Sequence, residues 1–204
     1  MGFILVAGPF TGPFAWSRVA EVLRARGKRV TVHGEDDPIA SAEAVGMVLV
    51  GHSGAGSRLP AIAHQLGGVE HAVYVDALLP HPGRSWAQTV PAAFVERLES
   101  QAEGGLLPPW SDWWGEDAMR ALLPDDEMRE RFVAGCPRVP VWVLHEVMPE
   151  VPEPPRSTFV QLSAAYESET AAARERGWPT TVLDLHHLAL LTDPEAIADA
   201  LLRV

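Results

Sequence analysis

Apolar residues fall into short runs that alternate with segments of helical period through the first half of the chain. Four runs have the length and β-branched content of buried strands: 3–7, 29–33, 46–50 and 71–75. Residues 15–26 and 59–66, between these runs, repeat apolar positions with helical period and stop at glycine. Strands that alternate with helices predict a parallel sheet covered by helices.

The pattern changes near residue 80, where proline and tryptophan become frequent. Helical fragments at 92–102 and 126–134 flank the segment LLPPWSDWWGED. Its three tryptophans are too apolar to gather on a surface without covering something. We therefore expect a cap insertion over the sheet at about 80–138; a surface insertion with no such role is the alternative.

Strand and helix signals resume after the insertion. The apolar runs 139–146, 158–163 and 180–185 predict strands, and 164–176 predicts a helix that ends at a glycine. The last helix begins at Asp193-Pro194-Glu195, with an N-cap residue, proline at N1 and an acid in the first turn. The sequence thus predicts a single α/β domain over 1–204, a mostly parallel sheet with flanking helices.

Charge and cysteine content narrow the class of partner. The formal net charge of −11 disfavours nucleic acid, because binding to phosphates relies on lysine and arginine. A single cysteine, Cys136, excludes an internal disulfide framework and fits a reducing cytoplasm. The first residues, MGFILVAGP, are too short an apolar run for a signal peptide or a membrane span. We expect a cytoplasmic protein that acts on a small molecule.

The segment VLVGHSGAG at 48–56 predicts a nucleophile on a tight turn. A strand that enters Gly-x-Ser-x-Gly and leaves as a helix exposes the central serine, and here Ala55 replaces the last glycine. The helix N-terminus then faces any anion that forms beside Ser53. An inert serine in a glycine-rich turn is the alternative interpretation.

A serine nucleophile needs a base, and chain order places that base after the last strand. The segment DLHHLALLTDP at 184–194 puts His187 where this strand should meet the last helix. His187 is therefore the candidate base, with His186 as the alternative and a purely structural pair as the third interpretation.

These segments resemble the α/β-hydrolase superfamily over nearly the whole chain, and in particular its branch of small esterases and hydroxynitrile lyases. The opening LVAGPFTGPFAW, the elbow VLVGHSGAG, the segment YVDALLPHPGRS and the terminal HHLALLTDP follow one another as the corresponding family segments do. The resemblance implies an α/β-hydrolase fold without its two leading antiparallel strands. The first strand of this chain would then be the one before the oxyanion loop.

The oxyanion loop departs from the family pattern. Where the family has His-Gly, this chain has Ala7-Gly8 followed by Pro9. The family residue at this place gives a backbone N–H to the oxyanion, and proline has none. Gly54 is the first expected donor, and the second must be Phe10, Thr11 or a side chain, or is missing.

The triad acid also departs from the family pattern. The strand that usually carries it, TFVQLS, is followed by no carboxylate until Glu167. Asp76 follows the strand next to the nucleophile strand and is the favoured substitute. Glu146, at the end of the run 139–146, is the second candidate; Glu167 or no acid at all remain open.

Three functions follow from these residues. The first is a serine hydrolase that cleaves an ester, thioester or lactone of a small apolar substrate through an acyl-enzyme. The second is a non-hydrolytic acid/base enzyme, such as a lyase or a ring-opening or ring-closing enzyme, and the third is a degenerate binding protein. No metal site or cofactor is expected, since no ligand spacing and no dinucleotide loop is present. The expected substrate-binding residues are Pro9, His52, Trp110, Trp113, Trp114 and Leu188.

Overall fold

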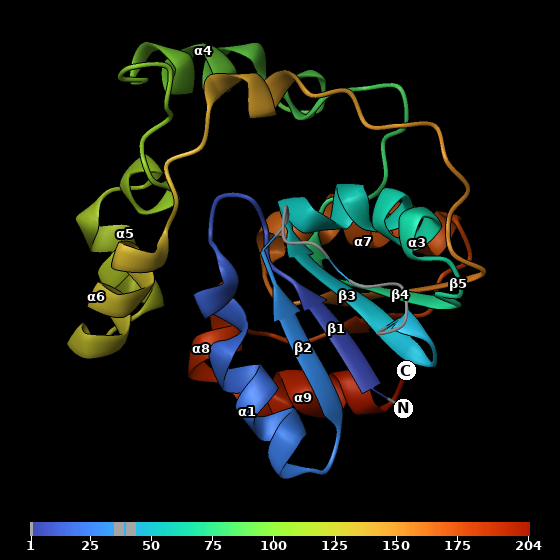
Figure 1. Ribbon diagram of the computed structural model, residues 1–204. Coiled ribbons are helices and arrows are strands. Elements are labelled where there is room, and N and C mark those ends of the chain that lie inside the picture. The colour runs from blue at the N-terminus through green and yellow to red at the C-terminus, as the bar shows by residue number, and fades with distance from the viewer. Residues whose placement is uncertain (1, 35–38, 40–43) are drawn as a thin grey trace.

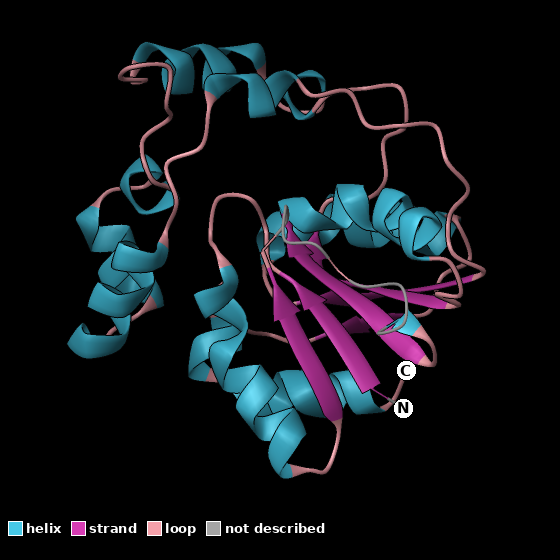
Figure 2. Ribbon diagram, viewed as in Figure 1, coloured by secondary structure: helices cyan, strands magenta, loops and turns pink. Residues whose placement is uncertain are grey.

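A six-stranded parallel sheet lies at the centre of the computed structural model, which describes residues 2–34, 39 and 44–204 (Figure 1 and Figure 2). The strand order is β2-β1-β3-β4-β5-β6, and neighbouring strands all run parallel. The strands are β1 (Gly2–Val6), β2 (Arg29–His33), β3 (Met47–Ser53), β4 (His71–Ala77), β5 (Arg156–Gln161) and β6 (Thr180–Val182). The predicted α/β class is confirmed.

Helices cover both faces of the sheet (Figure 1). On one face lie α1 (Ser17–Ala25), α8 (Ala189–Thr192) and α9 (Pro194–Leu202). On the other face lie α3 (Leu59–Leu66) and α7 (Glu167–Glu175). Each layer buries the apolar stripe of its helices against alternate residues of the strands, so the two faces have separate cores.

Residues 78–155, which we call the inserted segment, connect β4 to β5. The segment carries the helices α4 (Ala92–Ser100), α5 (Glu116–Leu122) and α6 (Asp126–Gly135), and three short 3₁₀ helices, η3 (Trp86–Gln88), η4 (Trp110–Trp113) and η5 (Val141–His145). Figure 1 shows α4, α5 and α6 beyond the carboxyl ends of the strands. The two ends of the segment are joined by backbone hydrogen bonds between 83–84 and Met148. The segment packs around an apolar core that it shares with Phe10, Ala15, Leu188 and Leu191, and Cys136 is buried in this core.

The predicted strand at 139–146 is wrong. These residues form η5 and belong to the inserted segment, which therefore extends past the expected boundary near 138. Pro137 and Pro140 lack the N–H groups that a central strand needs, and β4 pairs directly with β5, so no place in the sheet remains. Leu144 is buried in the core of the segment, whereas Trp142 is exposed.

The other predicted elements are present with shifted ends. The strand predicted at 180–185 ends at Val182, and α5 was not predicted from the sequence. The final helix begins at Pro194 as expected, but the Asp193 side chain accepts a hydrogen bond from Thr192 Oγ1 instead of capping the helix. No helix among the described residues is long and apolar enough to cross a membrane.

The turn after β3 requires glycine at position 56, where the 3₁₀ helix η2 (Gly54–Arg58) meets the end of β4. A Cβ on Gly56 would lie 2.2 Å from the backbone oxygen of Leu78 and 2.8 Å from Ala77 Cβ. Gly56→Ala should therefore lower the free energy of unfolding by about 3 kcal/mol, the upper end of ordinary overpacking costs.

Urea unfolding would measure this change. The matched control is Gly135→Ala, because a Cβ there would meet only Phe14 Cβ at an ordinary 3.5 Å. The control should unfold at the wild-type urea concentration or slightly above it. Equal midpoints for the two variants would contradict the packing interpretation.

Candidate active site

Ser53 lies on a strained turn at the carboxyl end of β3. Its backbone has φ 57° and ψ −129°, although it is not a glycine, and η2 begins at the next residue. The pairing of β3 with β4 shifts register between His52 and Ser53. A non-glycine residue at positive φ costs free energy and persists only where the surrounding structure imposes it. Ser53 therefore has the strained position that the sequence predicted for a nucleophile.

Gly54 and Pro9 are in close contact beside Ser53. A Cβ on Gly54 would lie 2.9 Å from Pro9 Cδ. Gly8 is also tight, though less so, because a Cβ there would lie 3.2 Å from the His52 carbonyl oxygen and 3.3 Å from Ser53 Cβ. The loop after β1 thus packs against the nucleophile turn and leaves no space for a side chain at 54.

The same loop leaves the Phe10 amide available to an oxyanion. The N–H groups of Thr11 and Gly12 both donate to the Gly8 carbonyl. Among the described residues, the Phe10 N–H has no hydrogen-bond partner, and Phe10 lines the same cavity as Ser53 and Gly54. The geometry is consistent with the predicted donors, Gly54 and Phe10, and with the loss of Pro9 as a donor.

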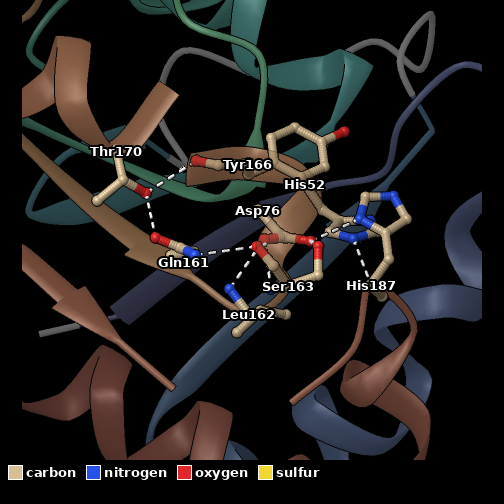
Figure 3. A network of polar contacts seen from close by, with 8 residues as sticks. All are labelled: His52, Asp76, Gln161, Leu162, Ser163, Tyr166, Thr170 and His187. Atoms are coloured by element: carbon tan, nitrogen blue, oxygen red, sulfur yellow. Dashed lines mark hydrogen bonds and ion pairs between the residues drawn. The ribbon is translucent and has the colours of Figure 1, made fainter. Parts of the chain in front are cut away.

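Asp76 and His187 form the central polar contact of the site (Figure 3). Asp76 Oδ2 lies 2.8 Å from His187 Nδ1 and 2.7 Å from Ser163 Oγ. Asp76 Oδ1 accepts the backbone N–H groups of Leu162 and Ser163 at 2.8 and 2.9 Å. The Asp76 side chain is completely buried, at the end of β4 with φ 43°. Every neighbour that holds this carboxylate comes from the loop after β5 or from His187.

This pairing fixes the charge and the tautomer. Burial alone would raise the pKa of Asp76, but the hydrogen bonds from His187 and Ser163 outweigh it and hold that pKa below its ordinary value. An ionised carboxylate only accepts hydrogen bonds, so His187 Nδ1 carries the proton. His187 Nε2 then carries no proton and can accept one from a hydroxyl group.

The other sequence candidates for acid and base lie elsewhere. The Glu146 carboxylate pairs with Arg58. Glu167 is exposed at the start of α7. His186 Nε2 lies 3.0 Å from Thr192 Oγ1. Asp76 and His187 are therefore the pair that the fold brings together.

His52 is hydrogen-bonded to the backbone of His187. Its Nε2 lies 3.0 Å from the His187 carbonyl oxygen, and the two ring centroids are 4.4 Å apart. Burial, with a smaller effect of His187, lowers the pKa of His52 to about 3, so its ring is neutral. Since a carbonyl accepts, His52 donates from Nε2, and this bond holds the backbone that carries His187.

An apolar cavity of about 640 Å³ opens above Ser53 and His187. Aromatic side chains make up much of its wall: Phe10, Trp86, Phe94, Trp110, Trp113, Trp114 and Tyr166. Glu169 is its only carboxylate among the described residues. The Trp110 ring also lies 5.9 Å from the ring of His187. A mostly apolar pocket of this size suits a small organic molecule.

The predicted substrate-binding residues divide into two groups. Trp110, Trp113 and Trp114 line the cavity, and Trp114 is about half exposed. Pro9, His52 and Leu188 are not part of its wall. Pro9 packs on Gly54, His52 holds the His187 backbone, and Leu188 is buried in the core that the inserted segment shares with the sheet domain.

Sequence reasoning missed Ser163, Tyr166, Trp86 and Phe94. Ser163 holds Asp76 through both its hydroxyl and its backbone. Tyr166 stacks on His187, with ring centroids 5.2 Å apart and an interplanar angle of 5°. Their position in the chain could have indicated Ser163 and Tyr166, because both follow the strand after which the family that this chain resembles carries its acid. Trp86 and Phe94 had no signal beyond the aromatic content of the segment.

The described residues contain no group of three or more metal-ligating side chains that could hold a metal ion.

A family model described as the alpha/beta hydrolase family matches residues 2–200. The chain belongs to this family. No curated protein matches it.

Several solved structures share the fold at low sequence identity. An extracellular alpha/beta-hydrolase from a Paenibacillus species is 17% identical, with a TM-score of 0.76, and 100% of this chain and 98% of that chain are covered. The methylesterase MES16 from Arabidopsis is 16% identical, with a TM-score of 0.69 and the same coverage. A variant of tomato methylketone synthase I is 16% identical, with a TM-score of 0.73 and coverage of 99% and 96%.

Proposed function

We propose that this chain is a serine hydrolase that cleaves an ester, thioester or lactone of a small apolar substrate through an acyl-enzyme. The observation that carries the proposal is the 2.8 Å contact between Asp76 and His187, with His187 and Ser53 on the wall of one cavity. This contact supports Asp76 as the acid, whose place the sequence left open. Membership of the alpha/beta hydrolase family, with a methylesterase among the similar structures, supports the same chemistry.

In the proposed reaction, Ser53 Oγ attacks the carbonyl carbon while His187 Nε2 takes its proton. The carbonyl electron pair moves onto oxygen, where the N–H groups of Gly54 and Phe10 stabilise the charge. The bond to the leaving oxygen, sulfur or lactone oxygen then breaks, and His187 gives that atom the proton. Water repeats these steps on the acyl-enzyme with the same base, which restores Ser53.

The cavity supports an apolar and partly aromatic substrate. Its wall is rich in tryptophan and phenylalanine, whose faces stack on flat rings at 4.5–7 Å between centroids. The single carboxylate, Glu169, disfavours an anionic group in the cavity and leaves neutral or cationic substrates. We infer a neutral aryl or alkyl ester of a size that about 640 Å³ can hold.

A fluorophosphonate probe tests the nucleophile. We expect one covalent adduct on the folded protein, located on the peptide that contains Ser53, because the probe reacts with an activated serine. Ser53→Ala should take up no probe, and His187→Ala should react at least about 100-fold more slowly because its base is gone. Intact mass and peptide mapping measure both results.

An unlabelled wild-type protein that is folded would overturn the proposal. Labelling of Ser57, which lies four residues on and donates to the Gly54 carbonyl, would also overturn it. If Ser53→Ala kept its turnover and His187→Ala lost it, the acyl-enzyme would be excluded and the non-hydrolytic acid/base enzyme preferred.

A further inference from the structure

Tyr166 stands beside the reacting atoms, on the 3₁₀ helix η6 (Ala164–Tyr166) after β5. Its backbone is held at both ends: its N–H donates to the Ser163 carbonyl at 3.2 Å, and its carbonyl accepts Thr170 Oγ1 at 2.9 Å. Thr170 Oγ1 also lies 2.7 Å from Gln161 Oε1, so its one proton is shared between two acceptors, and the Gln161 amide donates to the Ser163 carbonyl (Figure 3). The support of Tyr166 is thus the same network that fixes Asp76.

The Tyr166 side chain contacts both the nucleophile and the base. Its ring lies parallel to the His187 imidazole, with centroids 5.2 Å apart, and Figure 3 shows the two rings close together. Its hydroxyl interacts electrostatically with the Ser53 side chain, and both residues line the same cavity. Among the described residues, Ser53 makes no hydrogen bond to His187, and Tyr166 is the side chain that interacts with it.

These contacts place the phenol on the His187 side of Ser53. The opposite side belongs to the loop after β1, where Gly8 and Pro9 pack against the backbone of 53–54. The oxyanion faces that loop, whereas the leaving atom departs toward the base that must protonate it. The Tyr166 hydroxyl therefore lies next to the path of the leaving atom.

The phenol is suited to donate a hydrogen bond there. Shielding from water, only partly offset by the interaction with Ser53, raises the pKa of Tyr166 above the ordinary phenol value. The hydroxyl keeps its proton at neutral and mildly alkaline pH. It can turn from Ser53 to a substrate atom once Ser53 Oγ has become part of an ester bond.

We infer that Tyr166 is a catalytic hydrogen-bond donor to the leaving oxygen of the ester, an inference that rests on the proposed serine hydrolase function. As the C–O bond breaks, its electron pair goes to the leaving oxygen. That oxygen takes the proton from His187 Nε2 and a hydrogen bond from Tyr166, which itself stays protonated. The donor matters most for an alkoxide, which carries more charge than a nitrophenolate.

The test compares two esters of 3-phenylpropanoic acid, the ethyl ester and the 4-nitrophenyl ester. Tyr166→Phe should lower kcat/KM for the ethyl ester about 100-fold, the low end of what the loss of one such donor costs, mostly through kcat. The loss for the nitrophenyl ester should be at least about tenfold smaller, because nitrophenolate leaves without help. Steady-state rates give the ratio directly.

Tyr74→Phe is the matched control, because Tyr74 is the other tyrosine of the chain, is buried and stacks on Trp178 away from Ser53. It should keep the wild-type ratio between the two esters. Equal losses for both esters in a Tyr166→Phe protein that melts like the wild type would overturn the inference, as would an unchanged ethyl ester rate. If Ser53→Ala hydrolysed both esters, the proposed function itself would fail, whatever Tyr166→Phe did.

Discussion

Asp76→Asn is expected to lower kcat about 10⁴-fold, the loss that the same change produces in a Ser-His-Asp protease. In the wild type, Asp76 accepts the proton-bearing Nδ1 of His187 at 2.8 Å. An asparagine NH₂ at this place would instead donate, so the ring would carry its proton on Nε2. The base would then face Ser53 with the wrong tautomer.

Asparagine isolates this effect from the backbone. Asp76 has φ 43°, a region that asparagine tolerates better than most other residues. The asparagine oxygen can still accept the N–H groups of Leu162 and Ser163. We therefore expect a folded variant with little change in KM, measured by steady-state hydrolysis of the 4-nitrophenyl ester.

Glu146→Gln is the control, because it removes the charge of the other predicted acid, which pairs with Arg58. It should hydrolyse the ester at about the wild-type rate, since loss of a partly exposed ion pair changes little. A Glu146→Gln variant slower than Asp76→Asn would mean that the wrong carboxylate had been assigned to the base.

Gly54→Ala has the second-largest expected effect, a loss of about 100-fold to 1,000-fold in kcat, the range for one oxyanion donor. The new Cβ would lie 2.9 Å from Pro9 Cδ, well inside contact distance. The ring of Pro9 must move, and Phe10, whose N–H is the proposed second donor, is the next residue of that loop.

A double variant shows whether the clash with Pro9 is the cause. Pro9→Ala removes the ring atom that the new Cβ would meet, so Pro9→Ala/Gly54→Ala should recover at least about tenfold of the lost kcat, a strongly non-additive result. The four proteins of the cycle are compared with one ester. A double variant as slow as Gly54→Ala would attribute the loss to some other change at the nucleophile turn.

The sequence was sufficient wherever the signal was local. Buried parallel strands are near-continuous apolar runs, so β1 to β5 could be recognised from short windows. Ser53 could be found for the same reason, because strand, small residues and helix are consecutive along the chain. The prediction of His187 also required the order of segments in the family that this chain resembles.

Contacts between distant residues limited the rest. Asp76 and His187 are 111 positions apart, and only the strand order places them together. The run at 139–146 has the same apolar pattern whether it pairs in a sheet or buries Leu144 in another core. Tyr166 was missed because stacking on His187 depends on the angle between two rings, to which the local pattern is insensitive.

The cavity wall and the proposed catalytic residues come from different parts of the chain, and this separation affects how such a protein can evolve. The inserted segment, 78–155, supplies most of the cavity wall but contains neither Ser53, Asp76 nor His187. Substitutions within one continuous stretch can thus change which molecule is accepted while the proposed catalytic residues stay as they are. Selection for a new substrate and selection against loss of reactivity then act on separate parts of the gene.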